Sequence, residues 1–185
     1  MLEAVYKETK ARMSKSIDAV SREFSAVRTG KASPSLLDTV RVEAYETQMP
    51  VNQLATIATP EPRLLVLQAF DKSTVGDIVK GIQVADLGLN PVVDGQTIRI
   101  PIPPLNEERR KEMVRRCKTI AEEGRISVRN IRRDSNDTLK KAEKDKDISE
   151  DDLKKGLDEI QKVTDDYIEQ IDDLFERKEK DLLEV

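Results

Sequence analysis

Three stretches of the chain repeat apolar residues at alternating steps of three and four, the spacing that places them on one face of a helix. The first covers residues 2–27, the second runs from Glu107 to about Lys146, and the third begins after Ser149 and ends near Leu182. None of them is apolar on all sides, so each must bury one face against a partner. We therefore expect three long helices that pack together as a bundle.

Each predicted helix carries one apolar seam. In chain order, the seam residues are Leu2, Tyr6, Thr9, Met13, Ile17, Val20, Phe24 and Val27; Met113, Cys117, Ile120, Gly124, Val128, Ile131, Ser135, Thr138 and Ala142; and Leu153, Leu157, Ile160, Thr164, Tyr167, Ile171 and Leu174. The small residues Gly124 and Ser135 indicate close approach of a neighbouring helix. Three coiled-coil segments that dimerise would show the same repeat, but the short turn at Asp145–Asp152 favours folding back within the chain.

The helix ends carry recognisable signals. Gly30 follows the first seam and suits a C-terminal stop, because glycine enters the left-handed region cheaply. Asn106 is a good N-cap for the second helix. Ser149, with Asp152 three residues later, resembles a capping box at the start of the third.

Residues 31–105 break the helical pattern, and the prolines and glycines concentrate there. Residues 40–45 alternate between apolar and polar, residues 64–70 form a short apolar run, and Asp94-Gly95 is a hairpin signal. Between them, Ser73 to about Ala85 is predicted to be a short helix. Its cap would be Ser73, and its inward residues would be Ile78, Val79 and Ile82.

The predicted fold class is therefore α+β with two domains. Residues 1–30 plus 106–185 would form the three-helix bundle, and residues 31–105 a small inserted β/α/β domain. The chain crosses the boundary twice, so two adjacent strands could act as a hinge; a fixed elbow is the alternative. The predicted hinge residues are Gly30, Lys31, Pro103, Pro104 and Leu105.

Composition excludes several classes of chemistry. The chain has no histidine and one cysteine, Cys117, so histidine triads, histidine metal sites and an internal disulfide are ruled out. No nucleophile and base are paired in any recognisable pattern. We expect no catalytic residue, no metal and no cofactor. No apolar run reaches the roughly 18 residues of a membrane span, so we expect a cytoplasmic protein that does not enter a membrane.

Charge is segregated along the chain, although the net charge is only −4. Residues 106–133 hold ten basic and five acidic side chains, a net charge of +5, whereas residues 134–185 hold ten and nineteen, a net charge of −9. Phosphates respond to the local field rather than to the total, so the positive segment is a candidate for nucleic-acid binding.

The basic residues of the second helix form a stripe beside its apolar seam. Seven of them fall within an arc of about 100° and span about 33 Å: Lys111, Arg115, Lys118, Arg125, Arg129, Arg132 and Arg133. Because few acids stand within this row, we expect its arginines to be free for the phosphates of structured RNA. In the alternative, the stripe pairs with the acidic third helix, and the chain is a coiled-coil adaptor that self-associates.

Four ordered segments resemble the bacterial ribosome recycling factor family. They are RTGKASPSLLD at 28–38, DLGLNP at 86–91, IRIPIPPLNEERRK at 98–111 and VRNIRRD at 128–134. The resemblance is collinear over essentially the whole chain. It implies an L-shaped molecule in which a three-helix bundle carries an inserted β/α/β domain on a flexible two-strand hinge.

The same resemblance implies a translation factor that is not an enzyme and that acts as a monomer. The bundle would bind rRNA of the large ribosomal subunit in the post-termination complex. Elongation factor G, hydrolysing GTP, would then act on the small domain and hinge, and the subunits would separate. The residues that match the family's ribosome-binding arginines are Arg129, Arg132 and Arg133, with Arg110 and Arg28 near the domain junction.

One segment departs from the family pattern. The family usually shows a Tyr-Tyr-Gly-like turn followed by Pro-Leu, whereas residues 44–51 here read AYETQMPV. Glu46 stands where a turn glycine is usual, and Val51 where leucine is. We expect a different bend in this loop. The resemblance therefore predicts the contacts of the bundle more closely than those of the small domain.

Overall fold

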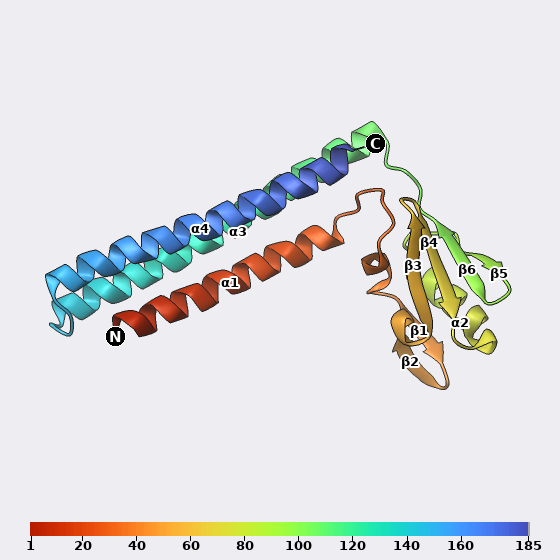
Figure 1. Cartoon of the computed structure of the whole chain (residues 1–185), viewed down its shortest axis with the longest axis horizontal. Helices are drawn as coiled ribbons and strands as arrows, with labels where there is room; N and C mark the ends of the chain where they lie inside the picture. Colours follow the sequence, from red (N-terminus) through yellow and green to blue (C-terminus); the bar gives the residue numbers. More distant parts are fainter. Residues whose placement is uncertain (185) are drawn as a thin grey trace. The chain divides into compact units, whose positions relative to one another are not determined.

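The computed structural model describes residues 1–184 and separates into two compact units. One unit contains residues 1–27 and the chain from Arg110 onward, and the other contains Arg28–Arg109. Three long helices, α1 (Leu2–Ala26), α3 (Glu107–Lys144) and α4 (Glu150–Leu183), make up the bundle (Figure 1). The α+β class, with a helical bundle and an inserted sheet and helix, is confirmed.

Helix α1 buries part of the predicted seam, while Leu2, Tyr6 and Ile17 are half-buried. Thr9, Met13, Val20 and Phe24 are buried on it. The helix ends earlier than the glycine signal suggested, because Val27 is already extended, with φ −78° and ψ 122°. Gly30 adopts a left-handed φ of +77°, but in the loop beyond the helix rather than as its C-terminal stop.

Helix α3 begins where the sequence predicts, and the Asn106 side-chain oxygen accepts a hydrogen bond from the Arg109 amide at 2.8 Å. The predicted seam residues are buried from Cys117 to Ser135, while Met113 is half-buried. The prediction for Thr138 is wrong, because Thr138 is exposed and Leu139 is buried in its place. Both spacings fit a helix, and at this point the step is four residues rather than three.

Helix α4 starts at the predicted capping box. The Asp152 amide donates to the Ser149 hydroxyl at 3.1 Å, and the Asp152 carboxylate accepts from the Ser149 amide at 3.3 Å. The turn that joins it to α3 contains Lys146 with a positive φ of 61°. The two helices therefore run antiparallel, as Figure 1 shows.

The second unit contains short elements of several kinds. In chain order they are the 3-10 helix Pro34–Leu37, β1 (Arg41–Ala44), β2 (Thr47–Pro50), the 3-10 helix Val51–Gln53, β3 (Ala55–Glu61), β4 (Leu64–Ala69), the 3-10 helix Lys72–Thr74, α2 (Val75–Val84), β5 (Val92–Asp94) and β6 (Thr97–Pro101). Strands β1 and β2 form a hairpin, and the other four form an antiparallel sheet in the order β3-β4-β6-β5.

The core of this unit is aliphatic. Leu65 and Leu67 of β4 and Ile98 and Ile100 of β6 are fully buried, and Ile78 of α2 packs into the same cluster. Strand β4 is central, with β3 and β6 as its neighbours. Its alternating burial explains why the run at 64–70 was recognisable as a strand.

Two local predictions for this unit need correction. Asp71, not Ser73, caps the segment before α2, because its carboxylate accepts the Ser73 amide at 2.9 Å. Of the predicted inward residues, Ile78 and Ile82 are buried, while Val79 is only half-buried. Strands β2 and β3 were not predicted, since almost none of their residues is buried and no apolar alternation marks them.

Candidate nucleic-acid interface

The structure places the predicted basic stripe on α3. Its members are Lys111, Arg115, Lys118, Arg125, Arg129, Arg132 and Arg133, and Arg110 lies in the first turn of the same helix. Arg28 is exposed and lies outside the helices, shortly after the end of α1. Of the predicted hinge residues, Gly30 and Leu105 lie close together: a Cβ added to Gly30 would be 3.3 Å from the Leu105 amide nitrogen.

Arg125 is held between two carboxylates. Its Nη2 lies 2.6 Å from Asp172 of α4, and its Nη1 lies 3.0 Å from Glu122, three residues earlier on α3. Only 21% of its side chain is exposed. Arg125 therefore joins α3 to α4 and is less available to an external anion than the stripe pattern implied.

Arg129 shares one of these carboxylates. Its Nη1 lies 3.1 Å from the second oxygen of Glu122, one turn further along the stripe. The hydrogen bonds from Arg125 and then Arg129 lower the pKa of Glu122, so this carboxylate is ionised at neutral pH. The expectation that few acids stand within the row is thus wrong at this point, because Glu122 bridges two of its arginines.

Arg132 has a neutral partner. Its Nη1 donates to the Gln161 side-chain oxygen of α4 at 3.0 Å, and the Gln161 amide nitrogen donates to Asp165 at 2.8 Å. This arrangement orients the guanidinium beside α4 without cancelling its charge. Arg132 keeps its full charge and donors that can turn toward a phosphate.

The remaining cations of the stripe differ in exposure. Arg115, Lys118 and Arg133 are exposed, and no ion pair or hydrogen bond of their side chains is seen within residues 1–184. The alternative in which the stripe is neutralised by the third helix therefore holds for Arg125, which pairs with Asp172 of α4. A positive surface remains around Arg132 and Arg133, with Lys118 two turns from Arg125.

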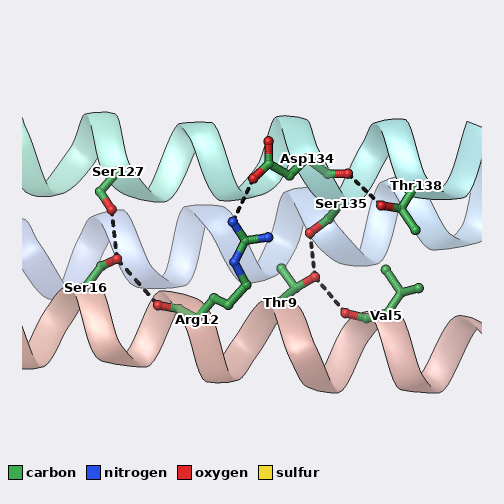
Figure 2. Close-up of polar contacts among 8 residues, drawn as sticks. All are labelled: Val5, Thr9, Arg12, Ser16, Ser127, Asp134, Ser135 and Thr138. Atoms are coloured by element: carbon green, nitrogen blue, oxygen red, sulfur yellow. Dashed lines mark hydrogen bonds and ion pairs between the residues drawn. The ribbon is translucent and has the colours of Figure 1, made fainter.

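A second polar system, which the seam pattern did not reveal, links α1 to α3 (Figure 2). The Thr9 hydroxyl donates to the Val5 carbonyl at 2.7 Å, so the buried Ser135 hydroxyl, also at 2.7 Å, must be the donor to Thr9. Arg12 reaches Asp134 at 2.7 Å. These contacts fix α1 against α3, the helix that carries the stripe.

Packing at Gly124 brings the helices close. A Cβ added there would lie 2.5 Å from Val20 of α1 and 3.3 Å from Ile171 of α4. The close approach predicted from Gly124 is confirmed, and both neighbouring helices take part in it. At this position α3 therefore packs against both α1 and α4.

The structure gives little support for a reactive cysteine, a metal site or a membrane span. Burial raises the pKa of the Cys117 thiol, which suits a buried apolar role rather than a reactive one. Within residues 1–184, no group of three or more acidic or cysteine side chains is placed to hold a metal ion. No helix in that part of the chain is long and apolar enough to cross a bilayer.

Comparison with known proteins identifies the family. The family model described as "Ribosome recycling factor" matches residues 20–183. The ribosome-recycling factor of Desulfatibacillum aliphaticivorans is 53% identical over 184 residues, and that of Bacillus subtilis is 52% identical over 185 residues; both alignments cover 100% of each chain.

Two solved structures show the same fold. A solution structure of a ribosome recycling factor superposes with a TM-score of 0.81 at 41% identity, over 100% of this chain and 98% of that one. The second belongs to a set of models for the T. thermophilus ribosome recycling factor and the E. coli elongation factor G bound to the E. coli post-termination complex; it has a TM-score of 0.69 at 45% identity, with 100% of both chains covered. The chain therefore belongs to the ribosome recycling factor family, whose members are translation factors and not enzymes.

Proposed function

We propose that this chain binds the post-termination ribosome and, with elongation factor G, splits it into subunits. The observation that carries this proposal is the similarity over the full length to ribosome-recycling factors, at 51–53% identity. A related factor has been described together with elongation factor G on the post-termination complex. The energy for splitting would come from GTP hydrolysis by elongation factor G. Since ribosomes are the target, the protein would work in the cytoplasm.

The bundle is proposed to attach to rRNA of the large subunit through the stripe on α3. Arg132 and Arg133 lead this contact, because neither is paired with a carboxylate within residues 1–184. Arg129 and Lys118 extend it, while Arg125, Lys111, Arg115, Arg110 and Arg28 would contribute more weakly or at the edge. If about four cations neutralise phosphates, the log–log salt slope of binding should be roughly −3.

The inserted domain is proposed to move as a unit at residues 30–31 and 103–105, with the functional boundary between 1–30 plus 106–185 and 31–105. Contacts of the segment that follows β6 support a hinge at residues 103–105. Ile102 is 4% exposed, and its amide donates to the Arg63 carbonyl at 2.8 Å, so the sheet holds the chain up to that residue. Pro103 and Pro104 come next and are exposed.

A rigid bundle with a movable insert would transmit force. Three packed helices resist bending, so a push delivered at the hinge would reach the rRNA contact rather than being absorbed. Attachment and movement would then depend on different residues. Variants of the stripe should impair binding, and variants of the hinge should impair splitting.

The attachment step can be tested by sedimentation with purified large ribosomal subunits over 50–200 mM salt. Arg132→Glu should weaken binding at least tenfold, because a cation in the contact becomes an anion facing phosphate. The matched control is Arg116→Glu, an equal charge change on the exposed far side of α3, which should change affinity less than twofold. Circular dichroism should show the same helicity in both.

Two results would count against the proposal. Unchanged affinity of a folded Arg132→Glu variant would remove Arg132 from the contact. Self-association of the wild type without co-sedimentation would replace the whole proposal with the coiled-coil adaptor.

The hinge step needs a different variant. Deletion of Pro104 shortens the second hinge segment, residues 103–105, and leaves the Ile102 hydrogen bond to the sheet in place. Binding should be preserved, while subunit splitting with elongation factor G and GTP, followed by light scattering, should slow at least fivefold. Pro104→Gly, which keeps the length, is the control and should slow splitting less. Equal losses of binding and splitting in the deletion would contradict a separate hinge role.

A further inference from the structure

Glu122 occupies a position that works against RNA binding. Its two carboxylate oxygens accept hydrogen bonds from Arg125 at 3.0 Å and from Arg129 at 3.1 Å, so one acid occupies the donors of two stripe arginines. Half of its side chain, 51%, is exposed to solvent. The stripe therefore already has one anion hydrogen-bonded to two of its arginines.

The two arginines depend on Glu122 to different degrees. Arg125 also has Asp172 at 2.6 Å, so it stays anchored to α4 whatever Glu122 does. For Arg129, Glu122 is the one carboxylate partner seen within residues 1–184. The guanidinium that Glu122 controls is therefore that of Arg129, whose side chain is 42% exposed.

We propose that Glu122 is an affinity-setting residue that competes with RNA phosphate for Arg129 and, in part, for Arg125. This inference rests on the proposed function, since the competitor is rRNA. An exposed ion pair of this kind stabilises a protein only weakly. A phosphate, which can accept several hydrogen bonds from one guanidinium, can therefore displace the carboxylate.

The physical consequence is a weaker and faster-releasing complex. When phosphate displaces Glu122, the freed carboxylate stays beside the RNA and repels it. A factor that must leave after the subunits separate gains from such a competitor, because moderate affinity goes with rapid dissociation. The arginines are also held in place in the free protein, since each donates a hydrogen bond to the carboxylate.

The test compares Glu122→Gln with Glu123→Gln. Both remove one negative charge from an exposed position of α3, but Glu123 lies beside Lys15 and Glu23 of α1 and is not bonded to the stripe. Affinity for purified large ribosomal subunits is measured by titration at 50–200 mM salt, and dissociation by chase with unlabelled protein.

Glu122→Gln should bind about threefold to tenfold more tightly, since up to two weak, exposed ion pairs no longer have to be broken. The salt slope should steepen by about one, and most of the gain should lie in slower dissociation. Glu123→Gln should change affinity less than twofold. In an Arg129→Ala background, the gain from Glu122→Gln should fall by at least half.

The outcomes separate the two proposals. If wild type fails to bind large subunits, the proposed function fails. If wild type binds but Glu122→Gln binds no more tightly than Glu123→Gln, the competition is overturned while the proposed function stands. An equal gain with and without Arg129 would also overturn it, because a general charge effect does not require that arginine.

Discussion

The bundle and the sheet unit differ in what their interiors contain. Four polar residues are buried within residues 1–184, and three of them, Thr9, Ser135 and Thr164, belong to the bundle. The sheet unit buries one, Thr74, and its core is otherwise an aliphatic cluster around Leu67. The bundle therefore contains more buried hydrogen-bonding groups than a purely apolar seam would need.

The difference follows from how each unit fixes its register. A sheet is registered by backbone hydrogen bonds, such as the pairing of Leu67 with Ile57 on one side and Ile98 on the other. Long amphipathic helices repeat their seam, so a shift along the axis would keep most apolar contacts. The Thr9–Ser135 hydrogen bond exists in only one register, and it penalises the others with unsatisfied hydroxyl groups.

The largest expected effect comes from a cavity in the aliphatic core. Leu67→Ala removes a fully buried side chain from the central strand β4 and should destabilise the sheet unit by about 3 kcal/mol. Because the bundle has a separate core, its amides should keep their protection. Hydrogen exchange read by mass spectrometry on peptides from 55–69 and 160–171 would show the loss confined to the first.

The matching variant in the bundle is Met13→Ala, which also removes a fully buried side chain. It should reverse the pattern, with lower protection at 160–171 and unchanged protection at 55–69. Uniform loss across both peptides in either variant would mean that the chain unfolds as one cooperative unit, and the comparison between two cores would lose its basis.

A smaller effect is expected from two helical glycines that differ in their surroundings. Gly124→Ala places a methyl group 2.5 Å from the stiff side chain of Val20, and overpacking of about 1–3 kcal/mol should exceed the gain of about 1 kcal/mol in helix propensity. Gly76→Ala in α2 meets nothing within 4 Å and should gain stability. Opposite shifts of the urea midpoint are expected, and a stabilising Gly124→Ala would show that α1 can move away freely.

The bundle was readable from the sequence because its signal is repeated many times. A seam of seven or more positions survives one error, such as the choice of Thr138 over Leu139. In the sheet unit each strand is short, so its pattern occurs only once and has no repeat to support it. Strand β3 is largely exposed at the edge of the sheet, so its sequence shows no apolar face.

The stripe was predictable as a set of positions, but its ion pairs were only partly so. Glu122 stands three residues before Arg125 and seven before Arg129, and these spacings share a helix face, so the bridge could have been found from the sequence. The partners on α4 could not. Asp172 and Gln161 face the stripe because of how α3 and α4 are registered, and no local pattern encodes that register.

An effect smaller than that of the glycine variants tests whether the Thr9–Ser135 hydrogen bond selects the register of the helices. Thr9→Val keeps the shape but removes the acceptor of the buried Ser135 hydroxyl, and should cost about 1 kcal/mol in thermal or urea unfolding. In the double variant with Ser135→Ala, neither hydroxyl is left unpaired, so part of the stability should return. A double variant that loses the full sum of both single changes would show that the hydrogen bond has no coupling and does not select the register.

The smallest effect lies in the sheet unit, at the β1–β2 turn. Tyr45 and Glu46 both adopt positive φ, 50° and 63°, which is the geometry of a type I′ hairpin turn. A left-handed residue other than glycine costs roughly 1 kcal/mol, so Glu46→Gly should stabilise the unit, by about 0.5 kcal/mol after the greater freedom of glycine in the unfolded chain is counted. The bend of the turn is thus expected to survive the replacement, with Tyr45 still donating to Asp71 at 2.9 Å.

Glu43→Gly is the matched control for that variant. It makes the same chemical change at an exposed position inside β1, where φ is not positive, and should lower stability by a similar amount. Urea unfolding of both variants should therefore give shifts of opposite sign. If both are destabilised alike, the charge of Glu46 rather than its backbone conformation sets the stability of the turn. The hairpin would then be held by side-chain contacts, as the bundle is, and not by backbone geometry.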